Sequence, residues 1–513
     1  MFYLGLDLGS SSVKASLVNA ESAEVVSTAT YPDNEMVISS PKPSWAEQDP
    51  FRWWDCCISA VQKIMTKVAI KPEAISGIGV AYQMHGLVML DQNNKVIRPA
   101  IIWCDSRTER QGNQLADVVG SHYYTQHLLN HPANFTASKL QWVKEFEPEN
   151  FARCKKILLP GDYIALCLTG EVTTTAAGLS EAILWDFKQQ SISDKMLQAL
   201  QIDRSWIPRL VPNIGIQGEL TEQAASDLGL RANTPVTYRS GDQPNNAFSL
   251  NVAKAGEIAA TAGTSGVIYG IKELPSSSDG YADDRHTDRL LGKANTFLHP
   301  TEDNQLTTAA SLICVSGAGR AYSWLRGILN TTRAAPKYSQ MNQMASNIDI
   351  GSEGLRFYPF GNGAERLLEN QNLGAHWHSL DFNRHHLGHI VRSVQEGVAF
   401  SFALGLELFS KSPSQLTKIR VGQNNLFLSN CFSYAIACLA NCPIEFYQTD
   451  GATGAARGAA LGDGFYDSCL QAFSQCVPIS YIEPDSSNRE KYLSALSHWK
   501  KNFPIHAAGE INE

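Results

Sequence analysis

The sequence predicts an α/β protein with two similar domains, and three observations support this prediction. Apolar alternation in the first 30 residues predicts strands, and residues 49–68 have the apolar spacing of a helix. A strand, a small polar turn and a second strand occur at the amino terminus and again at residues 257–269. A chain of 513 residues also has the length of roughly two to four domains.

The first 82 residues are predicted to form one α/β layer. The expected elements are strands at residues 2–8, 13–18, 24–30 and 75–82 and a helix at residues 49–68. Asp49 can cap the start of this helix, and Pro50 suits the first position within it. The turn Gly9-Ser10-Ser11-Ser12 joins the first two strands and is expected at one edge of the sheet.

Composition and charge narrow the classes of partner. The 50 Asp and Glu residues outnumber the 42 Lys and Arg residues, so we expect neither a nucleic acid nor an anionic membrane as partner. No apolar run approaches the ~18 residues that a membrane span needs. The eleven cysteines form no Cys-x-x-Cys pair, and segments such as those around Cys167 and Cys438 resemble core. This pattern favours buried, reduced thiols and a cytoplasmic location.

Two turns rich in Gly, Ser and Thr, at residues 9–12 and 261–266, are candidate phosphate sites. Glycine lets backbone N–H groups approach an anion closely, and hydroxyl groups add donors. Such turns are also common as hairpin tips that bind nothing. Asp7 favours the phosphate interpretation, because a carboxylate suits a strand interior poorly and Mg²⁺ held with phosphates would explain it. Two such turns facing each other could hold a triphosphate.

A series of motifs follows the order and spacing of a known family. The motifs occupy residues 7–14, 44–50, 83–86, 103–108, 159–163, 168–171, 241–243, 263–266, 396–400 and 451–460. Together they resemble the FGGY carbohydrate kinases, members of the actin-like ATPase superfamily. The resemblance implies two actin-like (ribonuclease-H-like) α/β domains with ATP and sugar meeting in the cleft between them. Residues 1–248 would carry the sugar site, the first phosphate loop and the catalytic Asp, and residues 249–513 the nucleotide site.

The resemblance also implies the residues of the site. Asp242 is the candidate base for the sugar hydroxyl, and Asp7 is a second catalytic residue through Mg²⁺. The sugar would contact Met84, His85, Trp103 and Gln243. The phosphates and the nucleotide would contact Gly9, Ser10, Ser11, Ser12, Lys14, Gly263, Thr264, Gly422 and Asn425.

Plainer interpretations of these residues stay open. Ser240-Gly241-Asp242 is also the pattern of a turn followed by a helix cap. Met84 and Trp103 are also compatible with ordinary core packing. His85 precedes Gly86 between two expected strands, so we expect it to be exposed on a loop.

Three departures qualify the resemblance. Ser10 stands where Thr is usual, and it keeps the hydroxyl group. Gly161 replaces the lysine of a Leu-Pro-Lys-Asp-Tyr pattern, so any role of that lysine is absent. Val421-Gly422-Gln423-Asn424-Asn425 replaces a Gly-Gly-Gly nucleotide segment, which leaves the adenosine contacts open.

The resemblance implies ATP-dependent phosphorylation of a ketopentose, with D-xylulose to D-xylulose 5-phosphate as the first expectation. Gln83-Met84-His85-Gly86 and the run at residues 44–50 favour this substrate. The alternatives are ribulose, a deoxyketose, gluconate or glycerol, or an actin-like nucleotide switch without sugar chemistry. Retention of both Asp7 and Asp242 opposes the switch, and Met84-His85 opposes glycerol. The oligomeric state stays open, with a homodimer as one option.

The last predicted helix, at residues 488–501, presents Tyr492, Leu493, Leu496 and Trp499 on one face. We expect that face to pack against the rest of the protein.

Overall fold

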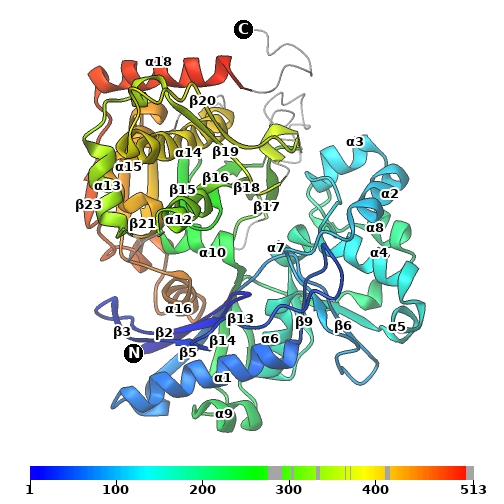
Figure 1. Ribbon diagram of the computed structural model, residues 1–513. Coiled ribbons are helices and arrows are strands. Elements are labelled where there is room, and N and C mark those ends of the chain that lie inside the picture. Colours follow the sequence, from blue (N-terminus) through cyan, green and yellow to red (C-terminus); the bar gives the residue numbers. More distant parts are fainter. Residues whose placement is uncertain are drawn as a thin grey trace.

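The structure is a computed structural model that describes residues 1–274, 290, 292–301, 306–330, 336–363, 366–369, 371–410 and 416–503. It contains two large sheets, one built from strands before residue 242 and one from strands after residue 256 (Figure 1). We call the corresponding parts the amino-terminal and carboxy-terminal halves. The division into domains at residue 248 stays a prediction.

The sheet of the amino-terminal half has six strands in the order β13-β14-β5-β1-β2-β3. The strands are β1 (Phe2–Leu8), β2 (Val13–Asn19), β3 (Glu24–Tyr31), β5 (Ile75–Tyr82), β13 (Ile214–Glu219) and β14 (Pro235–Gly241). The predicted opening hairpin is confirmed, because β1 pairs antiparallel with β2. β1 also pairs parallel with β5, so the Gly9–Ser12 turn follows a central strand, and the prediction that it lies at one edge of the sheet was wrong.

The sheet of the carboxy-terminal half has seven strands in the order β17-β18-β16-β15-β21-β22-β23. The strands are β15 (Glu257–Ala262), β16 (Gly266–Glu273), β17 (Asn295–Leu298), β18 (Thr308–Val315), β21 (Lys418–Gly422), β22 (Ile444–Tyr447) and β23 (Ser480–Ile482). β15 pairs antiparallel with β16 and parallel with β21, which repeats the arrangement of β1 with β2 and β5. The predicted second hairpin is therefore confirmed.

Helices cover both sheets. In the amino-terminal half the helices of six or more residues are α1 (Pro50–Lys67), α2 (Glu109–Val119), α4 (Thr136–Phe146), α5 (Pro148–Arg153), α6 (Pro160–Thr169), α7 (Ala176–Glu181), α8 (Asp194–Leu200), α9 (Glu222–Leu228) and α10 (Asp242–Ser249). In the carboxy-terminal half they are α12 (Ala318–Ile328), α13 (Tyr338–Ser346), α14 (Leu387–Ser410), α15 (Asn430–Ala440), α16 (Gly451–Gly462) and α18 (Ser486–Lys501). Asp49 caps α1 as predicted, accepting a hydrogen bond from the Phe51 backbone N–H.

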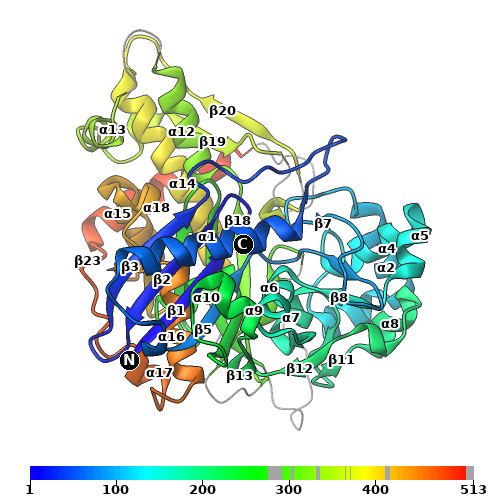
Figure 2. The same cartoon turned by 90° about the horizontal axis from the view of Figure 1, so that it is seen from below.

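Alternation along β1 separates two packing faces. Leu4, Leu6 and Leu8 belong to the same buried cluster as Trp53 of α1. Tyr3 points to the other face and joins a cluster with Ala455 and other residues of α16. Figure 2 shows α1 running along the strands β1 to β3 of this sheet. A helix from the carboxy-terminal half therefore covers one face of the amino-terminal sheet.

The packing of α16 requires glycine on two neighbouring strands. A Cβ atom on Gly5 of β1 would lie 1.8 Å from the carbonyl oxygen of Ala452. A Cβ atom on Gly79 of β5 would lie 2.0 Å from the carbonyl oxygen of Ala455. Because backbone cannot yield as a flexible side chain can, the absence of both side chains lets α16 approach the sheet this closely.

The two halves also meet along β17. The side-chain amide of Asn130 donates to the carbonyl oxygen of Thr296 at 2.6 Å and accepts from the Thr296 N–H at 2.8 Å. The Leu298 N–H donates to the Ser180 hydroxyl at 3.0 Å, which ties β17 to α7. These bonds place Phe297, between the two anchored residues, against the amino-terminal half.

The last helix packs as predicted, with one correction. Tyr492, Leu496 and Trp499 of α18 are buried, and the Trp499 ring stacks on Tyr358 of β19 (Arg356–Phe360). Leu493 is 37% exposed, so its inclusion in the packed face was wrong. A position one residue after Tyr492 is rotated by about 100° around the helix, away from the buried stripe.

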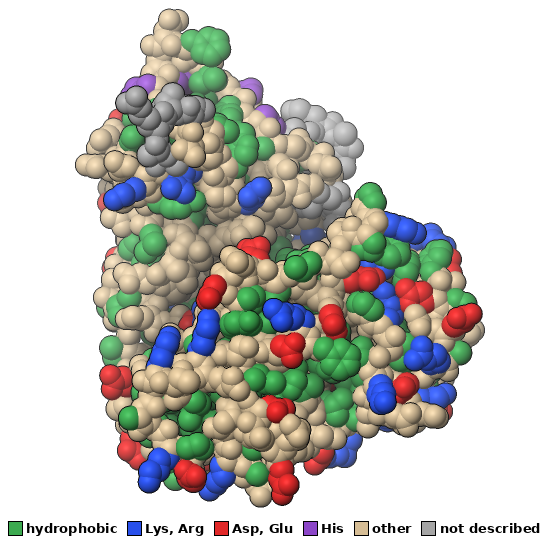
Figure 3. Space-filling view, turned by 60° about the horizontal axis from the view of Figure 1, so that its bottom comes forward, with side chains coloured by type: hydrophobic (Ala, Val, Ile, Leu, Met, Phe, Trp, Pro, Cys, Tyr) green, Lys and Arg blue, Asp and Glu red, His purple; other side chains and the backbone are tan. Residues whose placement is uncertain are grey.

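All eleven cysteines are free thiols. Cys438 is buried, as its apolar surroundings predicted, whereas Cys104 and Cys314 are exposed. None of the described helices is long and apolar enough to cross a membrane. On the face shown in Figure 3, basic and acidic side chains are interspersed. The cytoplasmic location and the homodimer stay predictions.

Replacing Gly5 with Ala should destabilise the fold by about 3 kcal/mol or more, at or beyond the upper end for overpacked sites, because the new methyl group meets helix backbone. Gly327→Ala is the matched control, since Gly327 lies in α12 with open space around it. That change should stabilise the protein by about 0.5–1 kcal/mol. Urea denaturation measures both, and equal stability of Gly5→Ala and wild type would contradict the packing argument.

Candidate active site

The first phosphate turn is closed by its own backbone and held by a side chain. The Gly9 N–H donates to the carbonyl oxygen of Ser12 at 3.0 Å. The Gln48 side-chain amide donates to the carbonyl oxygen of Ser10 at 2.7 Å, and the Trp103 indole N–H lies 3.4 Å from the Ser10 hydroxyl. Gly9, Ser10, Ser11 and Ser12 thus form a turn in which hydrogen bonds fix the carbonyl groups of Ser10 and Ser12.

The second turn, between β15 and β16, is held by the start of α12. The Gly319 N–H donates to the carbonyl oxygen of Gly263 at 2.7 Å, and the Arg320 N–H donates to that of Thr264 at 3.0 Å. A Cβ atom on Gly319 would lie 2.3 Å from the Gly263 oxygen, so only glycine fits there. The structure therefore gives Gly263 and Thr264 a fixed conformation.

The departure at residues 421–425 places two amide side chains beside this second turn. Gly422 ends β21, and Asn425 follows with a positive φ of 54°. The Asn425 side-chain amide donates to the Asn424 side-chain oxygen at 2.8 Å. The same amide nitrogen lies 3.5 Å from the position of a Cβ atom on Gly263. Gly263, Gly422 and Asn425, predicted from separate motifs, are thus close together.

Asp7 lies on the α16 face of β1, at the amino terminus of that helix. A Cβ atom on Gly451 would lie 2.2 Å from an oxygen of the Asp7 carboxyl group, so glycine makes room for it. Burial raises the pKa of Asp7 to about 6; Lys14 opposes the rise and Asp450 adds to it. The site therefore favours a cation or a proton next to Asp7.

Asp450 is a site residue that the sequence reasoning missed. Its carboxyl group caps α16 by accepting from the Thr453 N–H at 2.8 Å, and it pairs with Lys14 at 3.4 Å. Lys14, which lies opposite Asp7 on the neighbouring strand β2, therefore faces the start of α16. The sequence could have indicated Asp450, because it directly precedes the motif at residues 451–460 and helices commonly begin with a capping Asp.

Asp242 is the first residue of α10 and directly follows β14. Burial raises the pKa of its carboxyl group to about 7, repulsion from Asp7 adds to the rise, and hydrogen bonds from Gln243 oppose it. A group with this pKa can take up a proton near neutral pH. The Asn245 side chain donates to the carbonyl oxygen of Gly451 at 2.8 Å, which ties α10 to the start of α16.

His85 lies in the turn between β5 and β6 (Val88–Leu90), as predicted, but it is half-buried, so the expected exposure was wrong. Its ring lies 4.8 Å from that of Phe135 and 5.2 Å from that of Phe297. Phe297 comes from β17 of the other half, which is why local sequence could not show the burial. The residue has a positive φ of 61°, which is uncommon for a side chain of this size.

The environment of His85 fixes its charge and tautomer. Burial lowers the pKa of the imidazole to about 3, and Lys139 and Arg366 add to the effect. Nδ1 lies 3.2 Å from the carbonyl oxygen of Glu181, so Nδ1 carries the proton and donates. Nε2 is then an acceptor, which suits a sugar hydroxyl.

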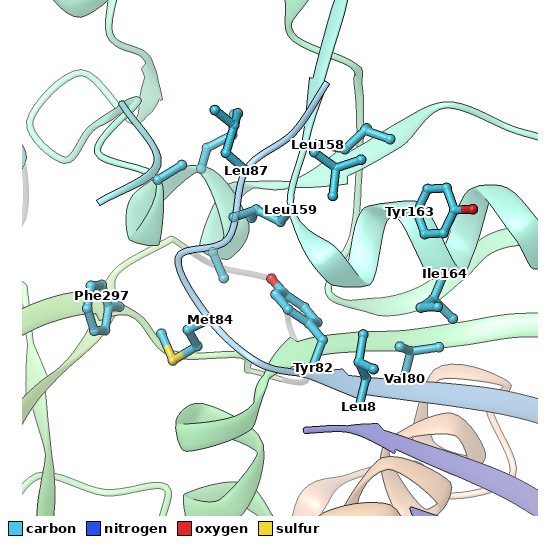
Figure 4. Packing of buried hydrophobic residues seen from close by; sticks show 14 of the residues in the cluster. Leu8, Val80, Tyr82, Met84, Leu87, Leu158, Leu159, Tyr163, Ile164 and Phe297 are labelled. Carbon is cyan, nitrogen blue, oxygen red and sulfur yellow. The ribbon is translucent and has the colours of Figure 1, made fainter. Parts of the chain in front are cut away.

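The other predicted sugar contacts differ in their surroundings. Met84 is buried, and Figure 4 shows its side chain between Phe297 and Tyr82. Trp103 is 51% exposed, which excludes core packing, and its indole N–H lies beside the Ser10 hydroxyl, so the ring stands next to the phosphate turn. Gln243 hydrogen bonds to Asp242, so it orients that carboxyl group.

Gly161 has a structural explanation. A Cβ atom at this position would lie 2.1 Å from the ring of Tyr82, the last residue of β5. Helix α6 therefore packs directly on the Tyr82 ring, with no space for the lysine of the usual pattern. Asp162, the next residue, is buried and pairs with Arg239 at 3.5 Å.

Comparison with known proteins gives the family. Residues 2–249 match the FGGY family of carbohydrate kinases, N-terminal domain. Xylulose kinase of Escherichia coli (strain K12) is 30% identical over 467 residues, which cover 89% of this chain and 88% of that protein. The chain belongs to the FGGY family of carbohydrate kinases. It is an ATP-dependent sugar kinase, as predicted.

Other relatives extend the match to the whole chain. Xylulose kinase of Bacillus subtilis (strain 168) is 28% identical over 98% of this chain and 96% of that protein. Among solved structures, the xyloylose (xylulose) kinase of Brucella ovis has a TM-score of 0.84 at 26% identity and covers 98% of this chain and 99% of that chain. The FGGY kinase thus has the two-domain actin-like (ribonuclease-H-like) ATPase fold, which confirms the predicted fold class.

Asp242→Asn tests the base assignment most simply, because asparagine keeps the size and loses the basic oxygen. We expect the rate of phosphoryl transfer at saturating sugar and ATP to fall by about 10²–10⁴. Sugar affinity, measured by direct titration, should change much less. Near wild-type turnover in this variant would show that another group accepts the proton.

Proposed function

We propose that this FGGY kinase phosphorylates a ketopentose, converting D-xylulose to D-xylulose 5-phosphate. The observation that carries the proposal is the position of Asp242, with its pKa of about 7, at the end of β14 beside Asp7 and the first phosphate turn. The names of the relatives support the choice of sugar. The proposed domains are residues 1–248 for the sugar and residues 249–513 for the nucleotide.

The chain's own residues suggest how the reaction proceeds. The Asp242 carboxylate accepts the proton of the attacking sugar hydroxyl as the bond to phosphorus forms. His85 Nε2 accepts a hydrogen bond from a second hydroxyl, and Trp103 offers a flat apolar face to the sugar C–H groups. The turns at residues 9–12 and 263–264 present N–H and hydroxyl donors to the phosphates, and closure of the halves keeps water out.

The residues around Asp7 fit Mg²⁺ bound with the phosphates. The Asp7 carboxyl group interacts repulsively with those of Asp450 and Asp242, and a cation would balance this negative charge. No group of three or more His, Cys, Asp or Glu side chains among the described residues could hold a metal ion. Asp7 would therefore share the ion with phosphate oxygens, where Mg²⁺ offsets charge that develops in transfer.

A second candidate, glycerol or a sugar acid as substrate, has less support. The His85 ring packs against Phe135 and Phe297, and the neutral imidazole offers no positive charge to a carboxylate. A ketopentose, which is uncharged and larger than glycerol, suits this neutral, aromatic-lined surface better.

A coupled assay of ADP release over a panel of ketopentoses, polyols and sugar acids tests the substrate. We expect D-xylulose to give the highest kcat/KM, because it matches an uncharged pocket with one neutral acceptor at His85. His85→Ala should raise the sugar KM about tenfold and leave kcat less affected, since this contact is present before and during transfer. Better use of glycerol or gluconate would overturn the proposal.

Asp7→Asn should raise the Mg²⁺ concentration needed for half-maximal rate by about tenfold, because the ion loses its charged protein partner. The measurement is the initial rate against free Mg²⁺ at fixed ATP. Thr264→Val, which removes a hydroxyl from the second turn, should instead raise the KM for ATP. An unchanged Mg²⁺ requirement in Asp7→Asn would contradict the assignment.

A further inference from the structure

Glu181 is a buried acid that none of the motifs identified. It ends α7 and is 2% exposed. Neither oxygen of its carboxyl group makes a hydrogen bond of normal length within the part of the chain that the structure describes, although the Tyr82 hydroxyl lies near enough to interact with it. Because buried polar groups are nearly always hydrogen-bonded, such a group needs an explanation.

The position of Glu181 links it to the proposed sugar site. Its Oε2 lies 3.0 Å from the point where a Cβ atom on Gly241 would stand, and Met84 Cγ lies 2.7 Å from the same point. Gly241 directly precedes the proposed base, Asp242. The backbone carbonyl of Glu181 also accepts the hydrogen bond that fixes the tautomer of His85. The carboxyl group thus lies where the sugar-contacting loop meets the strand end that carries the base.

The neighbouring ionisable groups have other partners, which distinguishes Glu181 from a structural ion pair. Asp162 of α6 pairs with Arg239 and accepts from the Thr174 hydroxyl at 2.9 Å. Lys139 of α4 donates to the backbone oxygen of His85 at 2.8 Å and to that of Asn134 at 3.0 Å. No described cation lies within ion-pair distance of Glu181, so its burial serves no salt bridge there.

The charge of Glu181 follows from these surroundings. Burial raises the pKa of the carboxyl group well above its ordinary value. The neighbouring hydroxyl of Tyr82 on β5 opposes the rise, Asp242 on α10 and Asp162 on α6 add to it, and Lys139 opposes it. A neutral carboxyl group can donate one hydrogen bond and accept another, which matches a sugar hydroxyl.

We infer that Glu181 binds a hydroxyl group of the sugar and helps to select the substrate, an inference that rests on the proposed function. Met84 is the flexible side chain next to the Glu181 oxygen, and its unbranched thioether can rotate aside when a sugar enters. Gly241 has no side chain to block the same space. The sugar would then lie among His85, Asp242 and Glu181, with a separate hydroxyl for each.

The test combines substitutions at Glu181 with sugars that lack one hydroxyl. The wild-type enzyme, Glu181→Gln and Glu181→Leu are assayed with D-xylulose and with its 1-, 3- and 4-deoxy analogues. The preference is the ratio of kcat/KM for D-xylulose to kcat/KM for a deoxy analogue. For one of the three analogues, this ratio should be at least ten in the wild-type enzyme. Glu181→Leu should reduce this ratio at least fivefold and leave the ratios for the other two analogues unchanged. Glu181→Gln, which keeps a neutral hydrogen-bonding group, should retain most of it.

Ser180→Ala is the matched control, because Ser180 is a buried neighbour in α7 whose hydroxyl bonds to the Leu298 N–H. This change should leave all three preferences as in wild type. Equal preferences in wild type and both Glu181 variants would overturn the inference and assign Glu181 a purely structural role. If Glu181→Leu does not fold, Glu181→Ala replaces it in the assay. Loss of the preference in Glu181→Ala would support the inference, and retention of the preference would overturn it.

The same assays separate this inference from the proposed function. If wild type does not use D-xylulose, the proposed function fails, and the series is repeated with the sugar that the panel identifies and its monodeoxy analogues. A Glu181-dependent preference for one hydroxyl in that sugar would still support the recognition role. Its absence there would overturn that role.

Discussion

The site depends on the close contact between α16 and the first sheet. Glycine at positions 5 and 79 brings helix backbone within reach of the strands, and this places Asp450 and Gly451 beside Asp7. Asn245 then ties α10, and with it Asp242, to the start of the same helix. Carboxyl groups from residues 7, 242 and 450, far apart in the chain, converge because one helix of the carboxy-terminal half lies on the sheet of the other.

Bringing these carboxyl groups together is electrostatically unfavourable, and the proposed reaction depends on the raised pKa values that result. Burial raises the pKa of Asp7 to about 6, with repulsion from Asp450 adding to the rise, and it raises the pKa of Asp242 to about 7, with repulsion from Asp7 adding to the rise. A carboxylate with an ordinary pKa is a weak base, whereas one near 7 is well matched to accepting a hydroxyl proton at neutral pH. On the sugar side the environment acts in the opposite sense, since burial keeps His85 neutral and hence an acceptor.

Local elements were predictable, whereas contacts between distant segments were not. Both hairpins, the Asp49 cap and the strand-to-helix junction at Asp242 follow from short-range pattern and turn chemistry. The burial of His85 depends on Phe297 of β17, and the role of Asp450 depends on where α16 packs. The burial of Glu181 could not be predicted, because a single Glu at the end of a short helix has the sequence pattern of a surface residue and only tertiary packing buries it.

The most direct measurement is the pKa of the Asp242 carboxyl group in the ligand-free protein, obtained by ¹³C NMR with Asp242→Asn to assign the signal. We expect titration near pH 7 in wild type, and a lower pKa in Asp7→Asn because the repulsion from Asp7 is gone. An ordinary value near 4 in wild type, unchanged by Asp7→Asn, would contradict the claim that carboxyl crowding around α16 prepares the base.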